Sequence, residues 1–244
     1  MDINDVLVFR LKGKFAHFKN FYSNKSSLTY KIPPRTVLMG MVASILGYSR
    51  DTYYKDFNID NAKFGLKVIN PGKSHFECMN YLKEDGAHTQ IRLQLLSSIK
   101  DSIEYEVYFT HYDKNIINYL EKKLIENQFG YGLYFGQRQF RVTAIFKERI
   151  KKDKITIINN YSDTISTVTF KENIISLNLD DNCKIIVDNI PISFVKVGDG
   201  REITKMAKIL FEESGKLISG VFKEALDIQK DKISFYTPLG VENK

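Results

Sequence analysis

The chain has 244 residues, of which 43% are hydrophobic, and a formal net charge of +7. This length and apolar content suit one large domain or two small ones and argue against a disordered chain. No stretch approaches the roughly 18 consecutive apolar residues of a membrane span, and the acidic start MDINDVLVF does not resemble a secretory signal. Cys78 and Cys183 are far apart and fit reduced thiols better than a disulfide scaffold, so we expect a soluble cytoplasmic protein.

The positive charge is concentrated in the first part of the chain. Residues 1–149 contain 22 Lys and Arg against 15 Asp and Glu, whereas residues 150–244 contain 14 of each kind. Residues 6–50 hold eight basic residues and no acidic one. Such a patch attracts polyanions, because each neutralised phosphate releases condensed counterions. The alternative is a solvated lysine-rich surface without a specific partner.

The first part of the chain begins with a strand pattern and a helix pattern. Residues 3–11 (INDVLVFRL) predict a buried strand, and residues 12–33, without a sustained period, predict an ordered loop. A helix is predicted to begin near Pro34, which suits a first turn, and to end at Gly47. One side of this helix has only small residues, so a second backbone or a ligand could approach it closely. These residues are Gly40, Ala43, Ser44 and Gly47.

The next elements repeat this strand and helix alternation. Strands are predicted over residues 62–70, 103–111 and 139–146. Residues 73–98 suggest an excursion such as a long hairpin, and residues 113–129 predict an amphipathic helix with Asp113 as its N-cap. The resulting order, β-α-β-(insertion)-β-α-β, is the ferredoxin-like split pattern of the α+β class. It describes an antiparallel sheet with both helices on one face.

The last part of the chain, residues 149–244, predicts a smaller antiparallel β domain. Short alternating runs occur at 154–160, 164–170, 174–179, 184–195 and 232–237. Turns are predicted at Asp188-Asn189 and at Glu213-Ser214-Gly215, and residues 202–212 fit either a helix or a strand. We therefore divide the chain into residues 1–148, with an insertion at about 71–100, and residues 149–244.

Metal and cofactor chemistry has no support in the residue pattern. The histidines and cysteines fall in no HxxxH or CxxC spacing, and neither a Walker A pattern nor a GxSxG elbow is present, so no metal and no cofactor is predicted. A glycine cluster could cradle a phosphate through backbone N–H groups, with arginines beside it. It is equally a plain loop that uses Gly130 as a helix C-cap. The cluster and its arginines are Gly130, Gly132, Gly136, Arg138 and Arg141.

The segment from residue 10 to residue 36 is the strongest functional signal and favours single-stranded RNA. Its basic residues, available for phosphate contacts, are Lys12, Lys14, Lys19, Lys25, Lys31 and Arg35. Its aromatic residues, on which unpaired bases can stack, are Phe18, Phe21, Tyr22 and Tyr30. His17 and nearby hydroxyls are candidates for bonds to 2′-OH groups or base edges. Phe9 and Phe15 are expected to pack in the core instead.

The same segment resembles a known family. FRLKGKFAHFKNFYSNKSSLTYKIPPRTVLMGMVASILG is similar to the N-terminal signature of CRISPR-associated protein five, in the RAMP superfamily. In that family a first strand leads to a G-x-x-A-x-F turn, and a Y-x-x-P-P-R-T segment opens a helix with an embedded glycine. The matching positions are Gly13, Ala16, Phe18, Tyr30, Pro33, Pro34, Arg35, Thr36 and Gly40. The likeness continues through HTQIRLQLL, YEVYFT and GYGLYFGQRQF, and ISFYTPLG near the C-terminus is similar too.

The resemblance implies a fold and a function. The fold is a ferredoxin-like, RRM-type domain with an inserted β-hairpin thumb and a small C-terminal β domain. The function is that of a non-catalytic subunit that caps the 5′ handle of the CRISPR RNA in a type I interference complex (Cascade), nearest to type I-B. Its partners are then the CRISPR RNA, the backbone subunit, the large subunit and indirectly target DNA, with no membrane. Arg92 on the thumb and residues 130–138 would close the RNA groove.

Two alternatives stay open. One branch of the family, from type I-C systems, cuts the precursor RNA without a metal and resembles a Tyr with an adjacent Lys–His pair. This chain has no adjacent Lys–His dipeptide. Substitutes for the base and acid that such cleavage needs are His111 with Tyr112 and Lys114, or His17 with Tyr30. The second alternative is a basic RRM-like adaptor with no CRISPR role.

Overall fold

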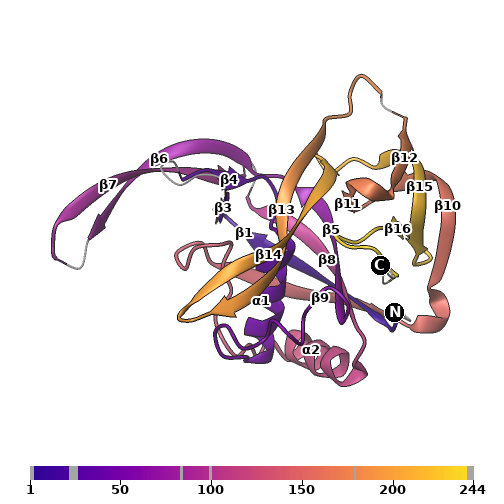
Figure 1. Cartoon of the computed structure of the whole chain (residues 1–244), viewed down its shortest axis with the longest axis horizontal. Coiled ribbons are helices and arrows are strands. Elements are labelled where there is room, and N and C mark those ends of the chain that lie inside the picture. The colour runs from indigo at the N-terminus through magenta and orange to yellow at the C-terminus, as the bar shows by residue number, and fades with distance from the viewer. Residues whose placement is uncertain (1–2, 22–26, 83–84, 99–100, 179, 241–244) are drawn as a thin grey trace.

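The computed structural model describes residues 3–21, 27–82, 85–98, 101–178 and 180–240 (Figure 1). In this part of the chain, strands dominate and two α-helices are present, which is a sheet-rich α+β architecture. Neither of these helices is long and apolar enough to cross a membrane.

A four-stranded antiparallel sheet forms the framework of the first part of the chain. In sheet order its strands are β5 (Ala62–Asn70), β8 (Ile103–His111), β1 (Val6–Gly13) and β9 (Val142–Ile150). β1 pairs on both sides, so it is a central strand. The strands predicted at 62–70 and 103–111 are confirmed, while the strand predicted at 139–146 begins later and runs further, as β9.

The two helices cover one face of this sheet. α1 (Arg35–Leu46) and α2 (Lys114–Glu126) both contribute buried residues to the cluster that contains Leu7 and Phe9 of β1. Successive side chains of a strand point to opposite faces. Val6 and Val8 accordingly join a second cluster on the other face, with Tyr108 from β8.

The helix ends follow from local sequence. α1 begins after Pro34 and ends at Gly47, whose φ of 83° is left-handed, as predicted. The side chain of Asp113 caps α2 by accepting a hydrogen bond from the Asn115 N–H at 2.8 Å. The C-cap of α2 is Asn127, with a φ of 52°. The alternative that gave Gly130 this role is therefore wrong.

A long hairpin projects from the body of the molecule (Figure 1). It consists of β6 (Lys73–Leu82) and β7 (His88–Ser97), in the segment where the sequence suggests one, and residues 83–84 between them lie outside the described part. Its base is held by β2 (Phe15–Ala16), which pairs with β7. β3 (Phe18–Lys19) and β4 (Thr29–Tyr30) pair with each other. The loop predicted over residues 12–33 thus contains three short strands.

The last part of the chain adds two further antiparallel sheets. The first contains β10 (Thr156–Ile165), β15 (Ile218–Asp227) and β12 (Ile174–Leu177), with β16 (Lys232–Ile233) paired to β15. The second contains β11 (Thr169–Phe170), β14 (Gly200–Glu212) and β13 (Ile185–Val197). Two short 3-10 helices are η1 (Lys152–Lys154) and η2 (Lys171–Asn173).

Three sequence expectations for this part are settled by the strands. The ambiguous residues 202–212 belong to strand β14. The turn predicted at Asp188-Asn189 is wrong, because both residues lie inside β13, and the chain reverses at 198–199 instead. The turn that includes Gly215 is confirmed, with a φ of 86°. Strand β15 was not predicted.

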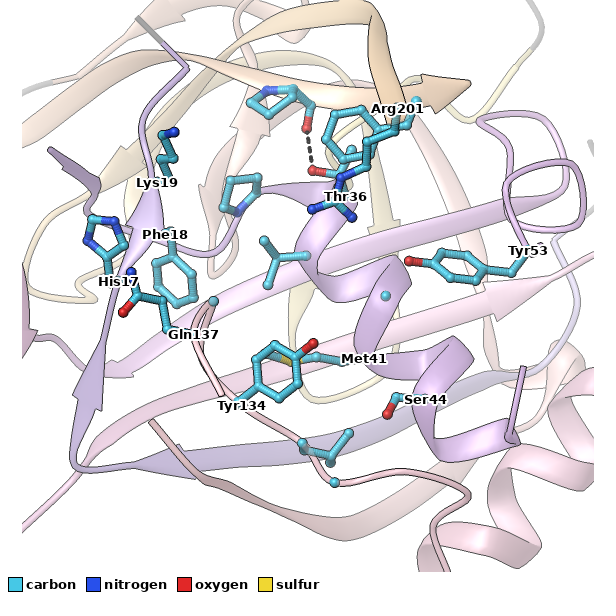
Figure 2. A pocket seen from close by; sticks show the side chains of 18 residues that line it. His17, Phe18, Lys19, Thr36, Met41, Ser44, Tyr53, Tyr134, Gln137 and Arg201 are labelled. Carbon is cyan, nitrogen blue, oxygen red and sulfur yellow. Dashed lines mark hydrogen bonds between the residues drawn. The ribbon is translucent and has the colours of Figure 1, made fainter. Parts of the chain in front are cut away.

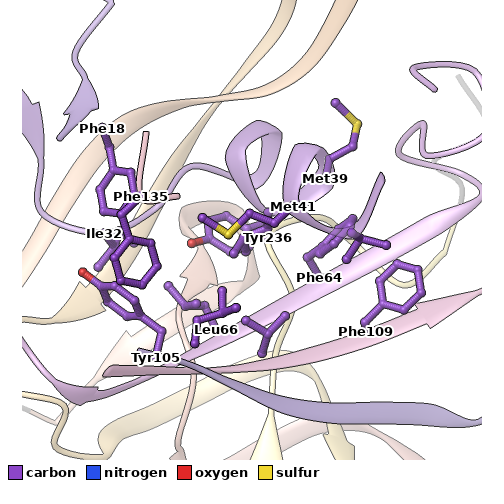
Figure 3. Packing of buried hydrophobic residues seen from close by; sticks show 14 of the residues in the cluster. Phe18, Ile32, Met39, Met41, Phe64, Leu66, Tyr105, Phe109, Phe135 and Tyr236 are labelled. Carbon is purple, nitrogen blue, oxygen red and sulfur yellow. The ribbon is translucent and has the colours of Figure 1, made fainter. Parts of the chain in front are cut away.

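One buried cluster joins the two parts of the chain (Figure 3). Phe64 of β5 and Tyr105 of β8 belong to the same cluster as Phe170, Phe211 and Tyr236 from beyond residue 149. The Tyr236 hydroxyl donates a hydrogen bond of 2.7 Å to the Pro33 carbonyl. The C-terminal sheets therefore pack directly on the first sheet and its helices.

Candidate functional site

A pocket of about 400 Å³ opens between four segments of the chain (Figure 2). The segments are β3, α1, the glycine-rich loop at residues 132–137 and the β13–β14 hairpin. Residues that line it include Phe18, Lys19, Gly40, Met41, Ser44, Tyr134, Gln137, Phe194 and Arg201. We call this space the β3 pocket.

The small side of α1 makes room for both the β3 pocket and a neighbouring backbone. Gly40 and Ser44 line the pocket, and a Cβ on Gly40 would lie 3.2 Å from the Tyr53 hydroxyl. At the C-terminal end of α1 the backbones of Gly47 and Gly130 pack together, and a Cβ on Gly130 would lie only 2.3 Å from the Gly47 Cα. The close approach of a second backbone that the sequence predicts is therefore present, next to the open pocket.

The glycine-rich loop is a docked wall of the pocket. The N–H groups of Gly130 and Tyr131 donate to the carbonyls of Ile45 and Ser44, at 3.1 and 3.0 Å. The N–H group of Phe135 donates to the Phe140 carbonyl at 2.9 Å, and that of Gly136 donates to the Tyr134 carbonyl at 3.1 Å. The N–H groups of Gly130 and Gly136 are therefore bonded within the protein and are not free for the predicted phosphate cradle. Gly136 has a φ of 84°, and a Cβ on it would lie 1.9 Å from the His17 carbonyl oxygen.

Two cations line the β3 pocket, Lys19 and Arg201. Lys19 is exposed, and Lys14 and Arg138 are exposed as well but do not line the pocket. Arg201 reaches the same pocket from the neutral half of the chain, with its guanidinium 5.3 Å from the centre of the Phe194 ring. Tyr134, which is 43% exposed, adds an aromatic face. The sequence pattern missed Arg201 and Phe194, because nothing in the local pattern places β13 and β14 beside α1.

His17 is a buried residue that lines the β3 pocket and contacts β7 of the hairpin. Only 2% of it is exposed, and its Nδ1 lies 2.7 Å from the Gln94 carbonyl oxygen. A carbonyl only accepts, so Nδ1 carries the proton and Nε2 accepts from the Ser27 hydroxyl at 3.3 Å. Burial lowers the pKa of His17. The imidazole is thus neutral at pH 7 and has both nitrogens occupied.

Two of the aromatic residues predicted to stack on bases are in the core instead. Phe18 is 1% exposed and lies 5.6 Å from Phe135, ring centre to ring centre. Tyr30 is also 1% exposed and donates to the Asn189 carbonyl at 3.0 Å. Tyr22 lies outside the described residues. The stacking roles predicted for Phe18 and Tyr30 therefore have no support in their burial.

Phe15 lies on the surface although the sequence places it in the core, whereas Phe21 lies on the surface as predicted. Phe15, expected in the core, is 42% exposed. Phe21 is 54% exposed and keeps the surface position that a stacking role needs.

Arg35, the arginine of the PPRT segment, is fully buried. Its guanidinium donates to the carbonyls of Phe57, Asn58, Ala62 and Ile192 at 2.8–3.0 Å. Burial lowers its pKa to about 9. The guanidinium holds together the start of α1, the segment before β5 and strand β13. The phosphate contact predicted for it is wrong, since none of this side chain is exposed.

Comparisons with known proteins fit this geometry. A family model described as CRISPR-associated protein (Cas5) matches residues 6–153, which include β3, α1 and the glycine-rich loop. The chain belongs to this family. The match contradicts the alternative of an adaptor unrelated to CRISPR proteins.

Two solved structures resemble the Cas5 chain. A CRISPR protein from Archaeoglobus fulgidus has a TM-score of 0.59 and 12% identity, over 96% of this chain and all of that one. A chain of a CRISPR RNA-guided surveillance complex has a TM-score of 0.52 and 14% identity, over 88% of this chain and 91% of that one. At such identities the likeness shows a shared fold. No curated protein matches the chain in sequence.

Three other predicted contacts of the Cas5 chain lie away from the pocket. Lys12 pairs with Glu104 on β8 at 2.8 Å, and Lys31 pairs with Glu213 at 3.1 Å. Arg92 lies on β7 of the hairpin, with its guanidinium 4.4 Å from the Phe76 ring centre. None of the three lines the β3 pocket. The structure therefore brings together only part of the predicted RNA-binding set.

The two candidate cleavage histidines are buried, although the His111 ring centre lies 4.9 Å from that of the exposed Tyr112. His111 is 1% exposed, its Nδ1 accepts from the Asp113 N–H at 3.0 Å, and its Nε2 donates to the Asp56 carbonyl at 2.9 Å. Lys114 is exposed at the start of α2. His17 and Tyr30 are buried and bond to different segments. Among the described residues, no group of three His, Cys, Asp or Glu is arranged to hold a metal ion.

Proposed function

We propose that this Cas5 chain is a non-catalytic RNA-binding subunit of a type I CRISPR interference complex, where it caps the 5′ handle of the CRISPR RNA and helps to nucleate the backbone filament. The observation that carries the proposal is the β3 pocket, open and lined by Lys19 and Arg201 in a chain of this family. The fold likeness to a chain of a CRISPR RNA-guided surveillance complex supports the same role.

The chemistry of the pocket suits a single strand. Lys14, Lys19 and Arg138 are exposed and neutralise backbone phosphates. Tyr134 presents a partly exposed ring beside the apolar Met41, where an unpaired base stacks for about 1–3 kcal/mol. Arg201 enters from the opposite wall and adds a charge or a base contact. The bases of a duplex are paired and stacked, so an unpaired strand is the form whose bases can enter such a pocket.

The fold supports a more detailed assignment. We infer that the first sheet and its helices form a ferredoxin-like, RRM-type unit, which the strand order β5-β8-β1-β9 supports. The β6–β7 hairpin takes the role of the thumb, with Arg92 on its surface. The projecting hairpin and its exposed arginine face the backbone subunit and the RNA, while the large subunit and, through it, target DNA are the further partners. Type I-B is the nearest branch by sequence signature.

Cleavage is the less favoured function. A metal-independent nuclease needs a base and an acid within reach of the same ribose and phosphate. His17 and His111 are buried with both ring nitrogens engaged, and Tyr30 is buried with its hydroxyl bonded to Asn189. Binding without cleavage is therefore the proposal.

An RNA-binding measurement tests the pocket assignment. We would measure the affinity of the purified chain for labelled CRISPR repeat RNA by fluorescence anisotropy at several salt concentrations. Lys19→Ala and Arg201→Ala, at two residues that line the pocket, should each weaken binding and reduce the slope of log K against log salt by about 0.7, the value for one lost single-strand phosphate contact. Lys147→Ala/Lys154→Ala, two exposed lysines that do not line the pocket, is the charge control. Equal slopes for the pocket and control variants would contradict the assignment.

A cleavage measurement on the same preparation tests the non-catalytic part. Repeat RNA incubated with the chain in EDTA should stay intact although it is bound. A discrete product that disappears in Lys114→Ala or Tyr112→Phe, both exposed positions, would move this chain to the nuclease branch.

A further inference from the structure

A second cavity, of about 540 Å³, lies away from the β3 pocket. It opens between the start of β5, strand β14 and the C-terminal segment 236–240, and it shares no lining residue with the β3 pocket. Its cationic residues are Lys63, Lys205 and Lys208, and its apolar residues include Phe170, Ile192 and Met206. We call it the Lys63 cavity.

Lys63 is a buried cation on the wall of this cavity. The residue is 3% exposed, and its ammonium donates to the carbonyls of Ile59 and Pro238 at 2.8 and 2.6 Å. An ammonium has three donors, and these two hydrogen bonds engage two of them. Burial lowers its pKa to about 8, and the group is still charged at pH 7.

A second buried cation lies behind the same wall. The Arg35 guanidinium donates to the carbonyls of Ala62 and Ile192, and Ile192 itself lines the cavity. Within the described residues neither Arg35 nor Lys63 forms an ion pair with a carboxylate. Asp60 attracts both cations and Glu224 attracts Lys63, in each case without a direct ion pair. A buried charge without a directly paired counter-ion is only partly compensated. An anion in the Lys63 cavity supplies that compensation.

The nearby acids fill this role only in part. Asp60 and Glu172 line the cavity and are exposed, as are Lys205 and Lys208, so water screens all four charges. Glu224 is partly buried, and its carboxylate accepts a hydrogen bond from the Leu239 N–H at 2.8 Å. Burial raises the pKa of Glu224. The cavity is lined by three lysines and two carboxylates, and only Lys63 among them is buried, so the charge facing a ligand is positive overall.

We propose that the Lys63 cavity binds a nucleoside monophosphate. The phosphate lies against Lys63, Lys205 and Lys208, where charge-assisted hydrogen bonds are strongest. The base lies against the apolar wall of Phe170 and Met206, which gives the cavity a preference for a nucleotide over free phosphate. This site is independent of the RNA-binding role proposed for the β3 pocket.

Calorimetric titration of the RNA-free full chain tests the proposal. AMP should bind saturably and more tightly than inorganic phosphate. Lys205→Ala/Lys208→Ala, which removes two exposed rim lysines, should weaken AMP binding by at least about tenfold. The charge control Lys147→Ala/Lys154→Ala should bind AMP as the parent chain does.

The buried lysine gives a second test. Lys63→Met that keeps the far-UV spectrum and the RNA affinity of the parent should bind AMP at least about tenfold more weakly. The absence of saturable AMP binding at millimolar concentration, or an effect of the rim variant no larger than that of the control, overturns the proposal. Equal affinities for AMP and inorganic phosphate overturn the assignment to a nucleotide.

Discussion

Arg35 shows what a single residue pattern reveals and what it conceals. The PPRT segment marks this arginine as important, and its place among seven basic residues at 10–36 suggests a phosphate contact. The structure gives it four carbonyl acceptors from residues 57, 58, 62 and 192. Such acceptors come from segments that meet only in the fold. A local sequence pattern shows the charge of a side chain, but it does not show the side chain's burial.

Arg35→Ala should therefore act on stability. The substitution leaves four buried carbonyls without their donor, so we expect a loss of about 3–5 kcal/mol in the free energy of unfolding, measured by urea denaturation. Lys14→Ala, at an exposed position in the same basic segment, should change it by less than about 0.5 kcal/mol. If the Arg35→Ala chain keeps its stability but loses RNA affinity, the result would support the phosphate contact that the sequence predicts for Arg35.

The two buried histidines make the fold sensitive to acid. Burial lowers the pKa of His17 and of His111 below the ordinary value of 6.5. As the pH falls below about 6.5, the unfolded chain takes up protons that the folded chain does not. Folding stability is therefore full above that pH and decreases toward the lowered pKa values, by at most about 1.4 kcal/mol per pH unit for each histidine.

Urea denaturation between pH 7.5 and pH 5 measures this dependence. His111→Gln should reduce the loss of stability on acidification, because one of the two proton-binding differences disappears. His88→Gln, at an exposed position on β7, is the matched control and should leave the pH dependence unchanged. The same acid sensitivity in all three chains would show that other groups cause it.

At the scale of elements, the sequence predicts those whose limits are set locally. Pro34 and Gly47 bound α1, and the Asp113 side chain caps α2, as their residue types indicate. Strand β15 was missed because Gly220 interrupts its apolar pattern. A Cβ there would lie 2.4 Å from the Ser176 carbonyl oxygen. The glycine is thus explained by the neighbouring strand β12, which the local sequence does not reveal.

The glycine-rich loop gives a prediction at the same scale. Gly136 and Gly198 both have a left-handed φ, of 84° and 56°, but only Gly136 has a backbone oxygen 1.9 Å from an added Cβ. Gly198→Ala should lower stability by about 1–2 kcal/mol through conformational strain alone. Gly136→Ala should lower it further and weaken RNA binding, because the loop has to move away from His17 and the β3 pocket changes shape.

Thermal unfolding and anisotropy on the two alanine variants measure both effects. Matched losses of stability, with RNA affinity equal in the two variants, would mean that the loop is not the docked wall described above.

At the scale of the whole molecule, the net positive charge lies in residues 1–149, but the candidate site also contains residues from the neutral part of the chain. Residues 150–244 are neutral overall, yet Phe194 and Arg201 from this part line the β3 pocket. The predicted boundary near residue 148 rests on composition and element type. Composition and element type do not indicate that Phe211 and Tyr236 pack in the same cluster as Phe64. Long-range packing is the part of the architecture that a single sequence conceals.

The shared core predicts one cooperative unfolding transition for the full chain. Phe211→Ala, at a position 2% exposed in the C-terminal part, should lower the free energy of unfolding by about 3–5 kcal/mol. It should shift the unfolding of the first sheet by the same amount, because both parts rely on one cluster. Leu217→Ala, at a 52% exposed position in the same part, should leave the transition nearly unchanged.

Hydrogen exchange measures the opening of the two parts separately, with the amides of β1 and β8 reporting on the first part and those of β13 and β14 on the C-terminal part. If the C-terminal strands of the Phe211→Ala chain open while β1 and β8 keep their protection, the two parts are independent folding units. If Phe170, Phe211 and Tyr236 complete the core of the first sheet, the amides of both parts should lose their protection against exchange together. In that case residues 1–148 alone expose this apolar surface and do not fold stably, since each buried side chain of this size contributes about 1.5–3 kcal/mol.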